Sequence, residues 1–592
     1  MLLRLAFAVC AAVLNHMPAF VWVLIDFISD VCSFWCRQCY SMVFDRHDPL
    51  KESITRLKNV ETFHEWKSTV TEIDRLTNMN LWRQNFISRH YDYMLINDRI
   101  QNLREARDGD EVLKLMSLLR SGLIRNFGGI AQKRLYLKAY LGTKYLIEEY
   151  VNEVLECLQY LSESMDLADT DIMNSKQLKL DFFHDARQSF GSSALLLQGG
   201  SLFGLCHLGV VKALYFKGLL PRIIGGSAVG AAVASLVGCL VDDELVPILL
   251  DIGKVMGNVD RLNHDVDERY GSVIDNVVKK GYSQDILLFL KFVRDQVGDL
   301  TFEEAYLRTE KILNIVIHPT NKSVPPLLNY ITAPNVIIWT AIYASIGTGV
   351  LSDNVCLYVK DFNNDIVPRN PELETTFLKP QDVSYNQQYF GGPNAAANYL
   401  SGHTPYARLT ELFNVNHFVI SLARPYLAPL ISNDLKHQSM KALKSPKHAS
   451  DHTTSATSEN FHAALVELEK YKTSHLNLVK RFKQVAGLEI QHRLQVMNKL
   501  GILGDMMKRF FIDEKPTSMQ SLASIREVTI VPELRYLVRD FSRVFDVHKS
   551  MENIPYWIFV GERSVWPLFP LLWTRCSIEF ALDDLYHKHR KG

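Results

Sequence analysis

The sequence predicts an α/β fold in which a sheet lies between layers of helices, with helical additions at both ends of the chain. The main observation is the stretch 194–240, where a short apolar run, a Gly-rich turn and a helix-like segment occur twice within about 45 residues. The flanking regions instead place apolar residues three and four positions apart, which is typical of helices. At 592 residues, the chain is too long for one ordinary core, so two or more domains are expected.

The first Gly-rich turn contains Gly199, Gly200 and Gly204. Glycine backbones can present their N–H groups outward, as an oxyanion hole requires. A dinucleotide fingerprint needs G-x-G-x-x-G, but this turn is G-G-x-x-x-G and has no acidic residue about 20 positions further on. Neither turn has the Gly-Lys-Ser/Thr of a phosphate-binding loop. Close packing of a helix on a sheet remains open as an alternative explanation of the glycines.

The second turn has the spacing of a nucleophile elbow, G-x-S-x-G, but not its serine. Gly226 and Gly230 have the required spacing, and the residue midway between them is Ala228. If Ser227 were the central residue, Val229 would occupy a position that favours glycine, and a β-branched residue tolerates unusual backbone angles badly. We therefore interpret the turn as an elbow whose nucleophile is replaced by Ala228. We expect the Ser227 hydroxyl to point away from the oxyanion donors.

These turns and several other blocks resemble the patatin-like phospholipase family. Within it, the chain is similar to the fungal triacylglycerol lipases of lipid droplets, a branch that includes lysophospholipid acyltransferase activity. The segments that carry the resemblance are Gln198–Gly204 with His207–Val210, Leu81–Tyr91, Asn329–Val336, Arg408–His417 and Ile554–Pro567. The resemblance implies a three-layer patatin-like fold and ester hydrolysis on stored neutral lipid without a cofactor. It also implies an oxyanion hole at Gly199, Gly200 and Gly204, with the nucleophile position at residue 228.

The resemblance also implies a catalytic aspartate in an Asp-Gly turn, which this sequence lacks after the elbow. The matching region contains Asn398, which cannot take up a proton as a carboxylate does. The aspartates upstream of it are better explained as surface carboxylates, so the base stays unassigned; they are Asp353, Asp361, Asp365 and Asp382. His207 is tempting as a general base, but we favour a role in helix packing or capping. No His-x-x-x-x-Asp acyltransferase motif is present.

Two classes of function therefore stay open. Either the chain is a triacylglycerol lipase whose functional serine was replaced by design, or it is a natural, inactive, lipase-like regulator and partner of an active lipase. Lys plus Arg equals Asp plus Glu, at 65 each, so no global charge indicates nucleic acid as a partner. The expected partners are triacylglycerol, a lipid-droplet surface and, if acyl transfer occurs, a lysophospholipid.

The nine cysteines are scattered along the chain, which is typical of a reducing, cytosolic compartment and not of a disulfide framework. Cys32, Cys36 and Cys39 cluster without a matching His/Cys group, so a zinc site is not expected. We predict neither a cofactor nor a metal site.

Residues 1–44 are the most apolar part of the chain. The uncharged runs Leu5–Leu14 and Met17–Ile25 are each shorter than the roughly 20 residues of a spanning helix, and Pro18 would break a helix joining them. We predict an anchor embedded in the lipid-droplet surface from its cytoplasmic face. A secretory signal and helices packed on the catalytic domain are the alternatives. The Trp566–Trp573 cluster is predicted either to join this anchor at lipid or to be buried core.

The predicted domain organisation follows from these patterns. After the anchor at 1–44, a helical domain occupies 45–190 and the patatin-like domain occupies 192–429. A Ser-, Thr- and His-rich flexible linker covers 436–460. The C-terminal region 461–592 is predicted to be helical and rich in aromatic residues.

Overall fold

The computed structural model describes ten ranges of the chain, which divides into two compact units, Met1–Thr77 and Asn78–Gly592. The described ranges are residues 49–163, 172–200, 202–261, 284–317, 325–346, 357–361, 363–369, 405–423, 527–533 and 550–591. The predicted anchor at 1–44 and linker at 436–460 lie outside them. In the first unit, α3 (Pro49–Asn59) precedes α4 (Phe63–Leu76). Thr62 caps the start of α4, because its side chain accepts the Glu65 N–H.

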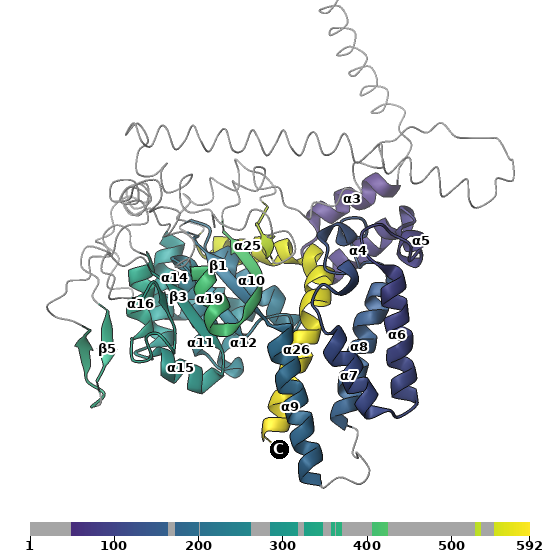
Figure 1. The fold of residues 1–592 in the computed structure, drawn as a ribbon. Helices are drawn as coiled ribbons and strands as arrows, with labels where there is room; N and C mark the ends of the chain where they lie inside the picture. Colours follow the sequence, from purple (N-terminus) through teal and green to yellow (C-terminus); the bar gives the residue numbers. More distant parts are fainter. Residues whose placement is uncertain are drawn as a thin grey trace, which may run out of the picture. The chain divides into compact units, whose positions relative to one another are not determined.

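The second unit begins with a helical region (Figure 1). Its helices are α5 (Met79–Gln84), α6 (Tyr93–Asp108), α7 (Val112–Gly122), α8 (Tyr145–Glu163) and α9 (Ile172–Phe190). The apolar residues of α6 recur at helical spacing, and its buried side chains include Ile96, Ile100 and Leu103. Because these buried side chains form one apolar stripe along the helix, α6 packs along its length against α8.

The central sheet has six strands in the order β4-β3-β2-β1-β7-β8. Its strands are β1 (Ser192–Gln198), β2 (Ile223–Gly226), β3 (Ile312–Val316), β4 (Leu327–Leu328), β7 (Val415–Leu422) and β8 (Glu527–Ile530). All neighbouring strands are parallel except β3 and β4. A separate antiparallel pair is formed by β5 (Tyr358–Lys360) and β6 (Ile366–Pro368).

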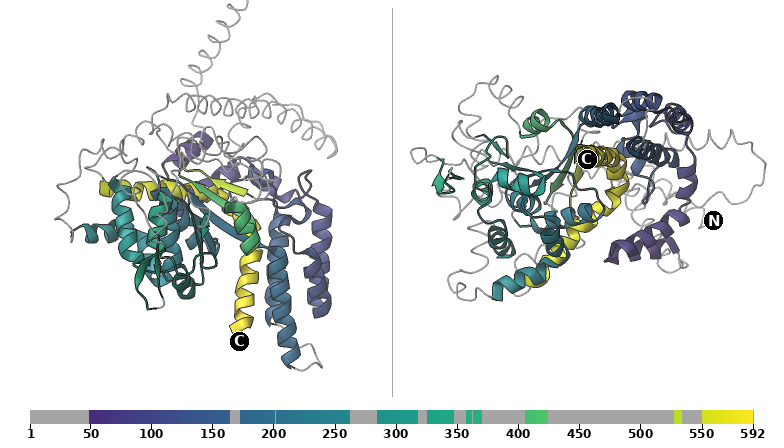
Figure 2. Two further views of the ribbon diagram at one scale, coloured as in Figure 1. Left: turned by 60° about the vertical axis from the view of Figure 1, so that its left-hand side comes forward. Right: turned by 90° about the horizontal axis from the view of Figure 1, so that it is seen from below.

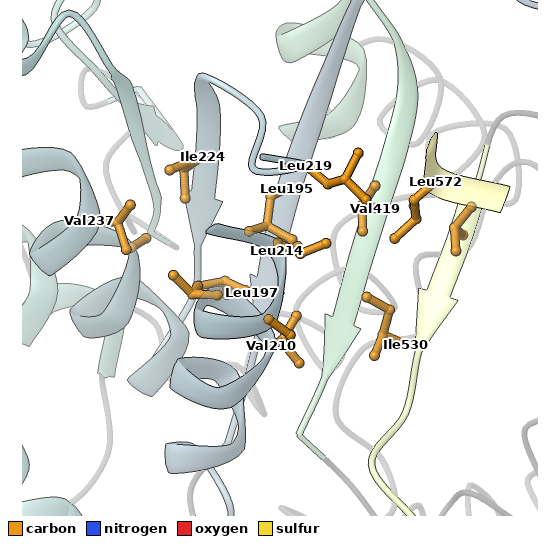
Figure 3. Close-up of a cluster of buried hydrophobic side chains, with 14 of the residues drawn as sticks. Leu195, Leu197, Val210, Leu214, Leu219, Ile224, Val237, Val419, Ile530 and Leu572 are labelled. Carbon is orange, nitrogen blue, oxygen red and sulfur yellow. The ribbon is translucent and has the colours of Figure 1, made fainter. Parts of the chain in front are cut away.

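Both faces of β1 are buried, which explains why this strand reads as an unbroken apolar run. Alternate residues point to opposite faces. Leu195 and Leu197 join the large core that also contains Val419 of β7 (Figure 3). Ala194 and Leu196 belong to a second, smaller cluster on the other face. The sheet is therefore enclosed on both sides by apolar side chains.

The remaining described helices pack on the sheet or on the helices that cover it. They are α10 (Leu205–Phe216), α11 (Val229–Cys239), α12 (Asp242–Arg261), α14 (Gln284–Val297), α15 (Phe302–Thr309), α16 (Ile338–Ile346), α19 (Pro405–Phe413), α25 (Ser550–Val565) and α26 (Phe569–Lys591). The first of them, α10, crosses α25 at two glycines. A Cβ on Gly209 would lie 1.8 Å from the Ile558 carbonyl oxygen, and one on Gly561 would lie 2.0 Å from that of Cys206. Only glycine permits this approach.

The structure confirms the predicted α/β fold with helical additions at both ends. It also decides between the two alternatives for the Trp566–Trp573 cluster. Trp566 is 1% exposed, and Leu571 and Leu572 are buried, while Trp573 is partly buried against the same core. The prediction that this cluster faces lipid is therefore wrong, because its apolar side chains pack inside the protein. Figures 1 and 2 show α26 running beside α9.

Candidate active site

The two Gly-rich turns lie together at the carboxyl ends of β1 and β2, which are adjacent parallel strands. This edge of an open α/β sheet is where such folds bind ligands. The turns are joined by hydrogen bonds: the Gly230 N–H donates to the Gly199 carbonyl at 3.2 Å, and the Ser227 N–H donates to the Leu197 carbonyl at 3.0 Å. The predicted oxyanion turn and the predicted elbow therefore form one backbone unit.

Ala228 has the backbone conformation that marks the sharpest point of the second turn. Its φ is 53° and its ψ is −125°, and α11 begins at the next residue, Val229. A non-glycine residue with positive φ is uncommon and strained. A nucleophile elbow places its central residue at such a strained strand-to-helix turn. The Ala228 side chain is also partly exposed, so it lies where a nucleophile could be reached.

The Ala228 backbone is held by a residue that sequence reasoning missed. The Ser345 hydroxyl, on α16, accepts the Ala228 N–H at 2.9 Å and donates to the Val316 carbonyl at 2.6 Å. Ser345 is 7% exposed. It therefore connects the strained turn to the end of β3. No local pattern in the sequence indicates this pairing, because 117 residues separate Ser345 from Ala228.

The glycines around Ala228 are required by close backbone contacts. A Cβ on Gly226 would lie 2.4 Å from the Gly230 carbonyl oxygen, and one on Gly230 would lie 2.1 Å from that of Leu197. In the first turn, a Cβ on Gly204 would lie 2.4 Å from Val229 Cγ1. The glycines around residue 228 are therefore required sterically, because the backbones of the two turns are in close contact.

The expectation for the Ser227 hydroxyl is wrong. We expected it to point away from the oxyanion donors, but it accepts the Gly199 N–H at 3.3 Å. The cause is the pairing of the two turns, which places Ser227 directly beside the end of β1. The Gly199 N–H is thus already engaged by a hydroxyl of the chain itself.

Comparison with known proteins places this arrangement in a family. A model of patatin-like phospholipases matches residues 195–351, which contain both turns. A domain of unknown function, DUF3336, matches residues 43–188. Triacylglycerol lipase 3 of Saccharomyces cerevisiae is 36% identical and is aligned over 98% of this chain and 96% of its own length.

The chain belongs to the patatin-like phospholipase family. Triacylglycerol lipase ptl1 of Schizosaccharomyces pombe is 34% identical over 91% of this chain and 85% of its own length. Triacylglycerol lipase 4 of Saccharomyces cerevisiae is 29% identical over 94% of this chain and 55% of its own length. The family predicted from the sequence blocks is therefore confirmed.

In this patatin-like chain, His207 is fully buried on α10 below the first turn. Its Nδ1 lies 2.9 Å from the Ser421 Oγ of β7. Burial lowers the pKa of His207 to about 4, although the nearby carbonyls of Gln198 and Gly199 partly oppose this shift. Within the described residues, Nε2 has no hydrogen-bond partner of normal geometry. A neutral, buried imidazole at this place supports the turn from inside the core.

Two of the aspartates considered for the base lie within the described residues, and both are exposed. Asp361 and Asp365 lie in the exposed turn between β5 and β6, where the Asp361 N–H donates to the Asp365 carbonyl at 3.0 Å. Asp353, Asp382 and Asn398 lie outside the described residues. The base of the patatin-like site therefore stays unassigned.

A second polar cluster lies at the other end of the sheet, near the amino ends of β1 and β7. Its centre is Ser193, whose hydroxyl donates to a Glu579 carboxylate oxygen and lies 3.1 Å from His417 Nδ1. Arg125 donates to the same carboxylate oxygen at 3.0 Å and to the Ser193 Oγ at 3.1 Å. We call these residues the buried node; they are Arg125, Ser193, His417, Arg575 and Glu579.

The buried node contains a serine, a histidine and a glutamate, but it is not arranged as a catalytic triad. In a triad the histidine lies between the other two side chains, whereas here Ser193 lies between His417 and Glu579. Burial, together with Arg125 and Arg575, lowers the pKa of His417 well below its usual range. Burial raises the pKa of Glu579, and Arg125 partly opposes that shift. Sequence reasoning missed this node because its members are far apart in the chain.

Within the described residues, no helix combines the length and the apolar character needed to cross a membrane. Among the same residues, no group of His, Cys, Asp and Glu side chains could hold a metal ion.

Proposed function

We propose that this chain descends from triacylglycerol lipases, binds neutral lipid esters at the paired turns of β1 and β2, and does not hydrolyse them through a serine nucleophile. The observation that carries the proposal is Ala228, which has the strained elbow conformation but no nucleophilic atom. The substrate class is supported by the relatives named triacylglycerol lipase.

In a form with serine at position 228, the hydroxyl would attack the acyl carbon of the ester. Backbone N–H groups of the first turn, at Gly199, Gly200 and Gly204, are proposed to hold the oxyanion. The Gly200 N–H is a better candidate than the Gly199 N–H, because Ser227 already engages the Gly199 N–H. Gly226 and Gly230 would allow the turn to close tightly around the nucleophile.

The acyl group on the serine would then pass to water or, in acyl transfer, to a lysophospholipid. Transfer would use the same elbow, since the sequence has no separate acyltransferase motif. We further propose that the chain acts at the cytoplasmic face of lipid droplets. The proposed boundaries are an anchor at 1–44, a helical domain at 45–190, a patatin-like domain at 192–429, a linker at 436–460 and a C-terminal region at 461–592.

The test is release of fatty acid from a triolein emulsion by the chain as it stands and by Ala228→Ser. We expect background rates from the first and a gain of several orders of magnitude from the second, since removing a catalytic serine costs about 10⁶-fold in kcat in well-studied hydrolases. Lipase-like rates from the unmodified chain would overturn the proposal. Gly230→Ala in the Ala228→Ser background is a negative control, because its Cβ would collide with the Leu197 carbonyl oxygen.

The second candidate function is an inactive regulator that binds lipid or an active partner lipase. The absence of a serine at residue 228, and of an Asp-Gly turn after the elbow, favours it. If Ala228→Ser folds normally but neither turns over triolein nor reacts with serine-directed reagents, the base and oxyanion hole are also lost. Stimulation of an active lipase by the unmodified chain would then support the regulator.

A further inference from the structure

The Ser227 hydroxyl is bound to one of the backbone groups that we propose for the oxyanion hole. Ser227 lies one residue before the nucleophile position, and its Oγ accepts the Gly199 N–H at 3.3 Å. The Gly199 carbonyl in turn accepts the Gly230 N–H at 3.2 Å. Gly199 is therefore attached to the second turn on both sides of residue 228, which brings its N–H next to the proposed reaction site.

The Gly199 N–H cannot serve the Ser227 hydroxyl and an oxyanion equally well. A hydrogen bond weakens steeply when it departs from a straight donor geometry, so one N–H makes one strong bond at a time. Donors in an oxyanion hole lower the barrier because they are aimed at the developing charge before the reaction starts. A donor that is already bound to a hydroxyl must first be released, and this release reduces the stabilisation that it gives to the oxyanion.

The Ser227 hydroxyl can leave Gly199 without a change in the turn. Its distance of 3.3 Å is longer than the usual range of about 2.7–3.2 Å for an N–H donor and an oxygen acceptor, so the bond is weak. Rotation about χ1 moves the hydroxyl between staggered positions. The Ser227 backbone is held separately, because its N–H donates to the Leu197 carbonyl at 3.0 Å. Ser227 and Ala228 are both partly exposed, so the rotated hydroxyl can reach solvent.

The negative charge of the oxyanion decides when the hydroxyl is displaced. A hydrogen bond to a charged oxygen is about twice as strong as one to a neutral oxygen. The neutral carbonyl of a bound ester therefore gains little by replacing the hydroxyl on Gly199, whereas the oxyanion gains more. The cost of displacement falls mainly on the step in which charge develops, so it affects kcat and not the binding of the ester.

We propose that the Ser227 hydroxyl competes with the oxyanion for the Gly199 N–H. The hydroxyl occupies this donor in the resting protein and is displaced as the negative charge develops. This inference rests on the proposed function, because it takes residue 228 as the place where esters react. Ser227 makes and breaks no covalent bond in this role; it lowers the rate by holding a donor. The same competition acts on a carboxylate that reaches Gly199, so it can be measured while Ala228 is in place.

The first measurement is triolein hydrolysis by Ala228→Ser, Ser227→Ala/Ala228→Ser and Ser235→Ala/Ala228→Ser. Loss of the Ser227 hydroxyl should raise kcat about fivefold, which corresponds to one neutral hydrogen bond, and should leave KM unchanged. Ser235→Ala is the matched control, because this hydroxyl donates to the Ala231 carbonyl of its own helix, and it should change neither constant. If Ser227 only supported the turn, its removal would lower kcat or leave it unchanged. Either result would overturn the proposal.

The second measurement is calorimetric titration of the full-length protein, with Ala228 in place, by oleate and by oleyl alcohol. Ser227→Ala should bind oleate about fivefold more tightly than the unmodified chain and Ser235→Ala do, because its Gly199 N–H is open to the carboxylate. Oleyl alcohol has no charge and should bind all three proteins equally. Equal oleate affinity in the three proteins, or binding to none of them, would overturn the proposal. Inactivity of every Ala228→Ser protein would refute the proposed function, and the oleate affinities would still decide whether Ser227 competes for Gly199.

Discussion

The two ends of β1 differ in what their side chains do. At the amino end, Ser193 joins a histidine, a glutamate and two arginines in the buried node, of which only Arg125 is partly exposed. At the carboxyl end, the paired turns consist of glycines and small residues around Ala228, with few polar side chains. The amino end of β1 contains residue types that are found in catalytic sites, but its role is structural. The carboxyl end, which we propose as the site of chemistry, contains an alanine.

Residue types alone therefore do not identify a functional site, because the backbone geometry and the exposure of the residues must also fit that role. Each member of the node makes at least one hydrogen bond, and the node joins the helical region, the sheet and α26. The turns instead hold strain at Ala228 and keep it partly exposed. Strained backbone conformations are concentrated at functional sites, and they persist only where the surrounding structure holds them in place.

The largest expected effect on stability is from Glu579→Ala. It leaves the Arg125 guanidinium, whose side chain is 10% exposed, without its ion-pair partner. Breaking one side of a buried pair costs about 3–5 kcal/mol. Denaturant unfolding should show this loss, whereas Glu411→Ala, which removes a partner from an exposed pair with Arg408, should cost less than about 1 kcal/mol. Equal, small shifts in both variants would mean that the node does not stabilise the fold.

Acid should destabilise the protein through its buried histidines. The pKa of His207 is lowered to about 4, and that of His417 also lies well below its usual range. Between pH 6.5 and about 4, the unfolded chain binds a proton at residue 207 that the folded chain does not, so stability falls as pH falls. The His207 contribution reaches about 3 kcal/mol at the acid end of this window.

His207→Gln tests this pH dependence. Its free energy of unfolding should change less steeply with pH between 6.5 and 4 than that of the unmodified chain. His64→Gln, at an exposed histidine of α4, is the control and should leave the slope unchanged. The same slope in all three proteins would contradict the assignment.

Ser345→Ala should weaken the strained turn. It removes the acceptor of the Ala228 N–H and the donor to the Val316 carbonyl, and an unsatisfied buried group costs about 1–3 kcal/mol. Ser235→Ala is a matched control on α11, because the Ser235 hydroxyl donates only to the Ala231 carbonyl of its own helix. A thermal-unfolding midpoint lowered equally in the two variants would show that the link to Ala228 has no special role.

Ala228→Gly should give the smallest change, and in the opposite direction. Glycine adopts positive φ without a steric penalty, so relief of strain at φ 53° should stabilise the chain by about 1 kcal/mol. In contrast, Ala231→Gly in α11 should destabilise it by about 1 kcal/mol. A lower thermal-unfolding midpoint for Ala228→Gly would mean that the turn is not strained in solution.

The parts of the fold that depend on local patterns could be predicted from the sequence. The duplicated strand–turn–helix pattern corresponds to β1–α10 and β2–α11. Glycine spacing singled out residue 228 because neither flanking glycine has room for a side chain. The orientation of Ser227 and the burial of Trp566 could not be predicted in this way, because they depend on neighbours distant in sequence. Ser345 and the buried node were missed for the same reason.

Labelling with a fluorophosphonate tests most directly whether position 228 is the nucleophile site of the elbow. The reagent is applied to Ala228→Ser and to Ser227→Ala/Ala228→Ser, and the modified residue is located by peptide mass spectrometry. We expect labelling at residue 228 in both, since Ser227 contributes a hydrogen bond to Gly199 but no chemistry. Removal of that bond should cost about 1 kcal/mol in stability. Labelling at Ser227 instead of residue 228 would contradict the account and move the elbow one residue earlier.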